Sequence, residues 1–229
     1  METATSTPAA PSASSTPAAP AAPSAPNRRE ALKARHRQAI LVAARQLVRQ
    51  RGGRGFGVAD LAERADVSPR TVFNHFVSLE DVVLATCADE VSAIVDRFNR
   101  ITAARPPADG ALETMTAAMR DTDIPPAISY FWQAFAGSPC NGSKQLEFFA
   151  AALTRAEQAL GAAAQRSYPQ ADPLQLELLA GTLVHGLAII ANQWIEATGG
   201  SLDAASRRTW NALFERFVTS VGGGFHDVT

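Results

Sequence analysis

The segment formed by residues 58–76 constrains the fold more than any other part of this chain. Its first half places apolar residues at helical spacing and leaves charged residues outside, which predicts a short helix. Asp66 then falls in a turn, where aspartate accepts the left-handed backbone better than most residues. Ser68 is a good N-terminal cap for a second helix, and Pro69 suits the first helical position because its missing N–H needs no partner there.

The second helix has a polar outer surface. Val72 and Phe76 fall on one side of it, and side chains that can form hydrogen bonds occupy much of the rest. Two short helices at a steep angle, the second one polar, are typical of the helix-turn-helix, in which the second helix enters the major groove of DNA. An ordinary helical hairpin would give the same pattern, so the surroundings of the segment have to decide.

The charges around this segment favour DNA. Residues 28–82 contain eleven lysines and arginines against six acidic residues, a net charge of +5, whereas the residues after Val82 carry a net charge of −5. The whole-chain charge of −1 therefore conceals a polarised molecule. Because neutralised phosphates supply most of the non-specific affinity for DNA, the basic end is the expected DNA-binding end.

Side-chain chemistry assigns roles within the second helix. Arg70 can donate two hydrogen bonds to a guanine and Asn74 can pair with an adenine, so these two residues and Thr71 are expected at base edges. Ser68, Phe73 and His75 are expected to position the DNA backbone. The complete set of expected DNA-binding residues is Ser68, Pro69, Arg70, Thr71, Phe73, Asn74, His75 and Arg54.

Composition divides the chain into three parts. Residues 1–26 contain no large apolar residue beyond Met1 and are expected to form a disordered tail rich in Ala, Pro, Ser and Thr. Residues 27–82 are expected to form the DNA-binding domain, and residues 83–229 a helical effector-binding and dimerisation domain. The start of the chain does not resemble a signal peptide, and no apolar run approaches the roughly 20 residues of a membrane span, which predicts a cytoplasmic protein without a membrane partner.

The same periodicity predicts an all-α protein of about nine helices. No segment alternates as a strand would, and no internal repeat is present. Besides the two short helices, the expected helices cover about residues 28–51, 79–104, 111–120, 125–136, 143–167, 173–198 and 202–221.

With these elements in place, the sequence resembles a known family. The basic first helix, the helix-turn-helix, the phrase FVSLEDVV that opens the next long helix and the divergent helical remainder are similar to the TetR family of bacterial transcription regulators. The resemblance implies a dimeric repressor or activator that leaves its operator when a small molecule enters the C-terminal domain. Its detailed part covers about residues 37–83 and includes Asp60, Ala62, Arg64, Ala65, Val67, Ser68, Thr71, Phe76, Ser78 and Glu80.

Three departures from the family pattern concern the turn and the DNA contacts. Asp66 replaces the turn glycine, Phe73 lacks the hydroxyl of a tyrosine that often contacts a phosphate, and Leu79 stands where the family usually has a phosphate-contacting lysine. Basic residues elsewhere can compensate for lost backbone contacts. The candidates are Arg28, Arg29, Lys33, Arg35 and Arg54.

The C-terminal part offers aromatic residues, methionines and many alanines but few basic groups, which predicts a small, mainly apolar ligand. Aromatic residues at helical spacing belong to a core more often than to a pocket wall. His185 has two interpretations, a buried histidine with a satisfied hydrogen bond or a residue that recognises the ligand. The expected ligand-binding residues are Met115, Met119, Phe131, Trp132, Phe148, His185 and Trp194.

The last two helices are expected to form the interface of a homodimer, as a four-helix bundle with their symmetry mates. The helix of residues 173–198 is apolar on all sides, so it must be buried on more than one side. The final helix carries an apolar stripe that a two-fold axis would place against its own copy. The expected interface residues are Trp210, Leu213, Phe214, Phe217 and Val221.

No motif in the chain predicts catalysis, a cofactor or a metal site. Residues 52–57 (GGRGFG) resemble a dinucleotide-binding loop, but they follow a helix and not a strand, so a turn is expected. The four histidines are scattered through the sequence, which disfavours zinc although distant residues can converge in space. The alternative to a ligand-controlled regulator is a DNA-binding protein without a small-molecule effector, either architectural or controlled by another protein. An enzyme is not expected.

Overall fold

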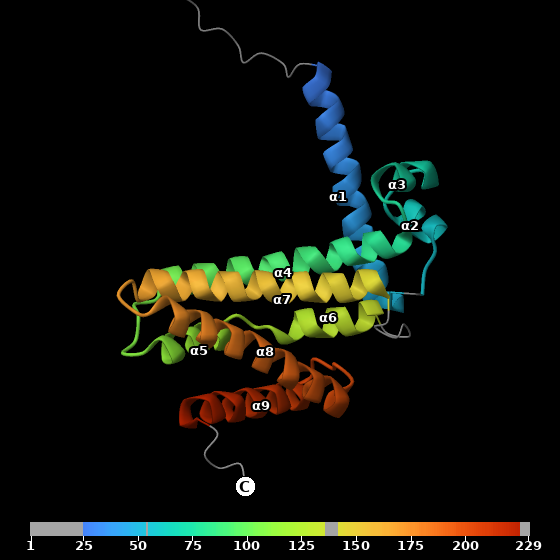
Figure 1. Ribbon diagram of the computed structural model, residues 1–229. Coiled ribbons are helices and arrows are strands. Elements are labelled where there is room, and N and C mark those ends of the chain that lie inside the picture. The colour runs from blue at the N-terminus through green and yellow to red at the C-terminus, as the bar shows by residue number, and fades with distance from the viewer. Residues whose placement is uncertain (1–24, 54, 136–141, 225–229) are drawn as a thin grey trace, which may run out of the picture. The chain divides into compact units, whose positions relative to one another are not determined.

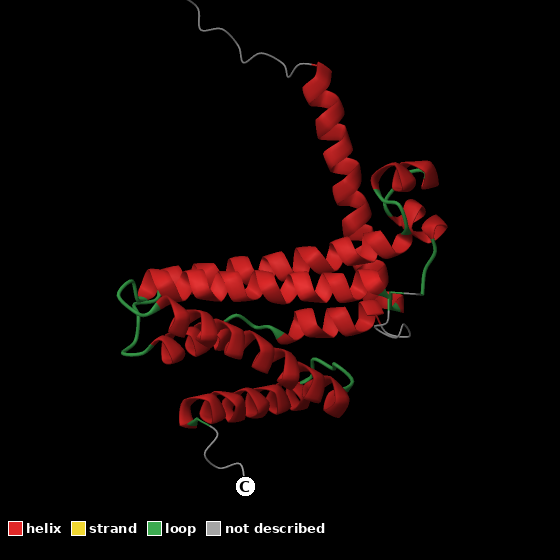
Figure 2. Ribbon diagram, viewed as in Figure 1, coloured by secondary structure: helices red, strands yellow, loops and turns green. Residues whose placement is uncertain are grey.

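The computed structural model describes residues 25–53, 55–135 and 142–224, and the side chains from Arg28 onward within them. All regular structure in these residues is helical, as Figure 1 and Figure 2 show. The prediction of an all-α fold with about nine helices is confirmed. The helices are α1 (Ala25–Arg51), α2 (Val58–Arg64), α3 (Pro69–His75), α4 (Leu79–Ala104), α5 (Ala111–Asp121), α6 (Pro125–Phe135), α7 (Ser143–Ser167), α8 (Pro173–Thr198) and α9 (Ala204–Gly223).

The chain forms two units, Met1–Arg35 and His36–Thr229. In the first unit α1 begins at Ala25, three residues earlier than the sequence indicated, and the described side chains from Arg28 on are all exposed. Residues 1–24, which make up most of the expected tail, lie outside the described residues. The predicted domain boundary after Val82 stays a prediction.

The second unit contains two apolar cores. The first core lies among α1, α2, α3 and the start of α4, where Ile40 and Leu61 are fully buried. Tyr130, Ala134 and Phe135 of α6 belong to this same core. The core that supports the helix-turn-helix is therefore not made from residues 27–82 alone.

The second core joins α8 and α9 to α4, α5 and α7. Trp194 of α8 is fully buried and lies edge-on to Trp210 of α9, with the ring centroids 5.7 Å apart. The indole N–H of Trp194 donates to the backbone carbonyl of Ser206 at 2.9 Å. The Asp172 carboxylate caps the start of α8, and Gly199 ends it with a left-handed φ of +63°. The contact between the two indoles and the hydrogen bond to Ser206 hold α8 against α9.

By length and composition, α8 is the one described helix that could cross a membrane, which the sequence analysis did not recognise. Only 28 % of its most apolar window is buried within the chain. One side of α8 packs against α7 and α9. A helix that serves a core on one side and a protein interface on the other meets the same length and composition test, so the apolar excess by itself does not indicate a membrane span.

Candidate nucleic-acid interface

Backbone and side-chain caps fix the first helix of the helix-turn-helix. Gly57 precedes α2, and its N–H donates to Asp60 Oδ2 at 2.8 Å. The other carboxylate oxygen of Asp60 accepts a hydrogen bond from Arg51 at 3.0 Å. The Gly57 N–H, and after it the Arg51 guanidinium, hold the pKa of the Asp60 carboxyl below its ordinary value. The end of α1 is thereby tied to the start of α2.

The turn between α2 and α3 has the geometry that the sequence predicted. Asp66 takes the left-handed backbone, with φ of +53°. The N–H of Val67 donates to the carbonyl of Ala62 at 3.0 Å, which closes the turn. Ser68 then caps α3, since its Oγ accepts the Thr71 N–H at 3.1 Å. These local contacts set the start of α3 firmly against α2.

The two sides of α3 differ as expected. Val72 and the following Phe76 are buried in the first core. The exposed residues of the helix include Arg70, Phe73 and Asn74. Of the seven expected residues in α3 and its Ser68 cap, five are exposed and two, Thr71 and His75, are half-buried. The exposed five are Ser68, Pro69, Arg70, Phe73 and Asn74. Arg54 lies outside the described residues.

The hydroxyl of Thr71 is already engaged. It lies 2.8 Å from Ser68 Oγ, so the cap and the candidate base contact use the same group. Arg70 and Asn74 form no ion pair or hydrogen bond that would hold their side chains against the described part of the chain. Arg70 and Asn74 are therefore the base-reading candidates with the greatest freedom to reach DNA.

Two residues of α1 that sequence reasoning did not select meet the end of α3. The imidazoles of His36 and His75 lie edge to face, with centroids 6.4 Å apart. The guanidinium of Arg37 lies over the Phe76 ring, 4.5 Å from its centroid. The residues of each pair are about forty positions apart in the sequence, so only the folded structure shows that they are neighbours. The basic character of α1 was the one sequence feature that pointed to this region.

A backbone contact connects this region to α6. The N–H of Gly53, in the turn after α1, donates to the carbonyl of Gln133 at 2.9 Å. Nearby, the Tyr130 hydroxyl lies 2.6 Å from Thr86 Oγ1 in a buried hydrogen bond that joins α6 to α4. Burial raises the pKa of the Tyr130 phenol. The helix-turn-helix is therefore held to the helical remainder by specific polar contacts as well as by apolar packing.

The seven expected ligand-binding residues are not gathered in one place. Met115, Met119 and Trp194 are buried in the second core. Phe131 and Phe148 pack edge to face at the margin of the first core, with centroids 6.2 Å apart. Two more are exposed at the surface, Trp132 and His185. A single pocket lined by all seven residues is not present in the described part of the chain, and the ligand site stays a prediction.

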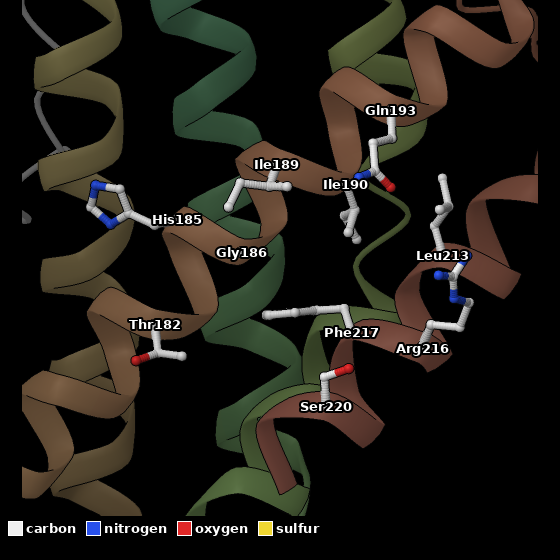
Figure 3. Close-up of a pocket in the computed structure, with 10 residues that line it drawn as sticks. All are labelled: Thr182, His185, Gly186, Ile189, Ile190, Gln193, Leu213, Arg216, Phe217 and Ser220. Atoms are coloured by element: carbon white, nitrogen blue, oxygen red, sulfur yellow. The ribbon is translucent and has the colours of Figure 1, made fainter. Parts of the chain in front are cut away.

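His185 lines a hollow of about 480 Å³ between α8 and α9, shown in Figure 3. Its Nδ1 lies 3.1 Å from Glu157 of α7. Exposed Ile189 stands next to it, and Leu213 and Phe217 enter the hollow from α9. His185 is therefore not the buried histidine that one of the two interpretations expected, and its role in ligand recognition stays a prediction.

The expected interface residues of α9 divide between two environments. Trp210 and Phe214 are buried in the core of their own chain. Leu213 and Phe217 are half-buried and face the hollow, and Val221 is half-buried further along the helix. Trp210 and Phe214 are therefore packed within their own chain, whereas Leu213, Phe217 and Val221 keep accessible surface, and the dimer interface stays a prediction.

Comparisons with known proteins agree with this geometry. Residues 40–86 match the family described as bacterial regulatory proteins, tetR family. A comparison with curated proteins found no match. Among solved structures, a TetR-family transcriptional regulator from Pectobacterium atrosepticum is similar, with a TM-score of 0.56, 17 % identity, and coverage of 84 % of this chain and 93 % of the other.

Two further structures show the same fold. A protein described as a TetR-family transcriptional regulator from Mesorhizobium loti MAFF303099 has a TM-score of 0.59 and 19 % identity, over 82 % of this chain and 97 % of its own. A transcriptional regulator of the TerR/AcrR family from Aquifex aeolicus VF5 has a TM-score of 0.52 and 14 % identity, over 82 % of this chain and 98 % of its own. At these identities the likeness concerns the fold.

Proposed function

Because the N-terminal part of this chain belongs to the tetR family of bacterial regulatory proteins, we propose that the protein is a dimeric, sequence-specific DNA-binding repressor. We place it in the cytoplasm and propose that a small, mainly apolar molecule releases it from its operator. The observation that carries the DNA-binding part is the exposed polar side of α3, opposite the buried Val72. Proteins of this family regulate transcription and are typically not enzymes.

Direct reading of bases is assigned to Arg70 and Asn74. Both are exposed on α3, and an arginine that donates two hydrogen bonds to guanine contributes about 1–3 kcal/mol of discrimination. Thr71 contributes less, because its hydroxyl also pairs with Ser68. The exposed Phe73 ring can contact a thymine methyl group or a sugar.

The test compares one selected duplex with one scrambled duplex. The first is the tightest binder obtained from a random-sequence library, and the second has the same composition. Arg70→Ala should weaken binding to the selected duplex by about 5- to 150-fold, and binding to the scrambled duplex by much less. Arg155→Ala, an exposed arginine of α7, is the matched control for lost charge and should change neither. Equal losses on both duplexes would contradict base reading by Arg70.

Dimerisation is assigned to the outer side of α8 together with α9. Leu178 and Ile189 are 62 % and 60 % exposed in a single chain, an unusual exposure for large aliphatic residues, and Ile189 also lines the hollow. A two-fold axis would bury this surface against its own copy. It would also pair two recognition helices, as a palindromic operator requires.

Ile189→Glu tests this interface better than a change at Phe217. The Phe217 ring packs on Gly186 so closely that a Cβ there would lie 2.1 Å from Cε2, so a Phe217 variant would also disturb its own chain. Ile189→Glu should give monomers by light scattering and weaken binding to the selected duplex. Leu146→Glu, at a residue of α7 that is 57 % exposed, should stay dimeric. A dimer in both variants would contradict the assignment.

Control by a small molecule is supported by the family resemblance and by the apolar composition of the second core. Met115, Met119 and Trp194 are packed and buried there, so a ligand between them requires that these side chains separate. Intrinsic fluorescence can detect this, because Trp194 is buried whereas Trp132 is 49 % exposed. A blue-shifted or quenched signal together with release from DNA is expected for an apolar effector. DNA binding without response to any compound of a broad apolar panel would favour the alternative, a protein that has no small-molecule effector.

A further inference from the structure

Helix α6 is hydrogen-bonded to two turns that are distant from it in the sequence. The hydroxyl of Ser129 donates to the backbone carbonyl of Gly200, in the turn between α8 and α9, at 2.7 Å. One helical turn later, the carbonyl of Gln133 accepts the N–H of Gly53, in the turn that leads to α2. The Gln133 side chain joins these two contacts, because its Nε2 donates to Ser129 Oγ at 3.3 Å. A continuous series of hydrogen bonds thus connects the α8–α9 turn, through α6, with the turn that precedes the helix-turn-helix.

The hydroxyl of Ser129 does not bond within its own helix. A helical serine commonly donates to the carbonyl four residues earlier, as Ser92 of α4 does to Ala88 at 2.8 Å. Ser129 is buried and donates to a separate element instead. The α8–α9 turn lies close to α6, since a Cβ on Gly200 would be 3.4 Å from Trp132 Cδ1. Loss of the Ser129 hydroxyl would therefore remove the donor of a buried carbonyl in this contact.

The Gln133 carbonyl is available because α6 ends two residues later. The last four carbonyls of a helix have no partner within it. Gln133 belongs to this group, since α6 ends at Phe135, and Gly53 supplies the missing donor. Both end groups of the series are backbone atoms of turns, so a rotamer change in either turn cannot absorb a displacement. Ser129 and Gln133 thereby hold the two turns in one relative position.

We propose that Ser129 and Gln133 are positioning residues that set the distance between the two recognition helices of the dimer. The inference rests on the proposed function, in which α8 and α9 form the interface and α3 reads DNA. Within one protomer, the distance from α3 to the two-fold axis depends on how the α1–α2 turn is held relative to the α8–α9 turn. The dimer therefore selects operators by the separation of their half-sites as well as by their bases, and it does so without a small molecule.

The experiment compares the selected duplex with two derivatives that have one base pair inserted or removed between the half-sites. Each change moves the half-sites by about 3.4 Å and rotates them by about 35°. The wild type should bind the original spacing most tightly. Ser129→Ala should reduce this preference by about 2- to 10-fold, the equilibrium factor that corresponds to one hydrogen bond. Ser92→Ala is the matched control, because it removes the same hydroxyl from a bond within one helix, and it should keep the wild-type preference.

A double variant tests whether the two side chains act in series. Gln133→Ala removes the bond to Ser129 Oγ and keeps the backbone bond to Gly53. It should reduce the spacing preference in the same direction as Ser129→Ala. Once the serine hydroxyl is absent, the Gln133 side chain has lost its acceptor there, so Ser129→Ala/Gln133→Ala should lose no more preference than Ser129→Ala. Additive losses would overturn the assignment to one series.

A second measurement needs no DNA. A spin label at Glu63→Cys, an exposed position of α2, reports the distance between its two copies in the dimer. Cys140 is replaced by serine in all labelled proteins, and burial raises the pKa of the Cys87 thiol to about 12, so Cys87 does not react with the label. Ser129→Ala should broaden or shift the distance distribution. Ser92→Ala should leave it unchanged.

The outcomes separate this inference from the function on which it rests. If Ser129→Ala lowers the melting temperature but keeps the wild-type spacing preference and distance distribution, the serine only stabilises the fold, and the inference is wrong while DNA binding stands. A wild-type dimer that binds all three spacings equally would overturn it as well. If Ser129→Ala does not fold, Gln133→Ala at its half-buried site decides by the same two measurements. If the wild type binds no duplex, the proposed function fails and this inference with it.

Discussion

Replacing Gly53 by alanine should break the contact between the turn after α1 and helix α6. Gly53 is buried, and its N–H donates to the Gln133 carbonyl at 2.9 Å. A Cβ at this position would lie 1.8 Å from the carbonyl oxygen of Ala134 and 2.6 Å from its carbonyl carbon. These are backbone atoms of a helix, so no side-chain rotation can relieve the overlap.

The expected cost has two parts. Forcing an extra carbon into a packed contact destabilises proteins by about 1–3 kcal/mol. If the turn moves away to make room, the hydrogen bond to Gln133 is lost at a cost of about 1 kcal/mol more. The free energy of unfolding should therefore fall by about 2–4 kcal/mol. In a chain of this length, 1 kcal/mol corresponds to about 2–4 °C, so the melting temperature should fall by roughly 4–16 °C.

Thermal and urea unfolding of the purified protein measure this loss. Gly161→Ala is the matched control, because a Cβ added at this position of α7 meets nothing within 4 Å. Removing a glycine from a helix interior should raise stability there by about 0.5–1 kcal/mol. A Gly53→Ala protein that melts within about a degree of the wild type would refute the argument that the turn and α6 are in backbone contact.

Three further changes test other contacts. Ser68→Ala should lower the free energy of unfolding in urea by about 1 kcal/mol through loss of the α3 cap, whereas Ser68→Asp keeps a capping oxygen and should not. Tyr130→Phe should cost about 1 kcal/mol by the same measurement, because Thr86 keeps a second partner in a backbone carbonyl; no loss would mean that the 2.6 Å bond contributes nothing. Asp60→Asn should reduce the amount by which the free energy of unfolding falls as the pH is lowered below about 4. The folded pKa of Asp60 lies below its ordinary value of 3.8, so the stabilisation is present above about pH 4 and is lost as the pH falls through the folded pKa; an unchanged dependence on pH would contradict this role of the Gly57 N–H.

The helix-turn-helix was predictable because its signals are local. Asp66 in the left-handed region and Ser68 as the cap of α3 each depend on residues within a few positions. Capping, turn geometry and proline at the first helical position act over one turn of backbone, so a single sequence contains them. The exposed side of α3 followed directly, because Val72 and Phe76 had to point inward.

The sequence could not predict in the same way which partner each apolar helix face packs against. Helical periodicity shows that α9 has an apolar stripe, but it does not show whether that stripe meets the same chain or a second copy. In the structure Trp210 and Phe214 serve their own chain, and Leu213 faces the hollow with Phe217. The same limit applies to His185. The sequence left open whether it is a buried histidine or a ligand contact, and the structure places it at the surface of α8, a helix that also exposes Leu178 and Ile189.

The sequence also did not predict that α6 contributes to the first core. This contribution matters for the proposed regulation by a ligand. α6 contributes to both cores, with Tyr130 in the first and Ile128 packed against the second. A ligand that separates side chains of the second core therefore acts on a helix whose other end is bonded to the turn at Gly53. Because that bond joins two backbone atoms, a shift of α6 cannot be absorbed by a change of rotamer. It has to move the turn that leads into α2, or break the bond, and either result alters the support of the recognition helix. A ligand changes DNA affinity only if it prefers one of these arrangements to the other.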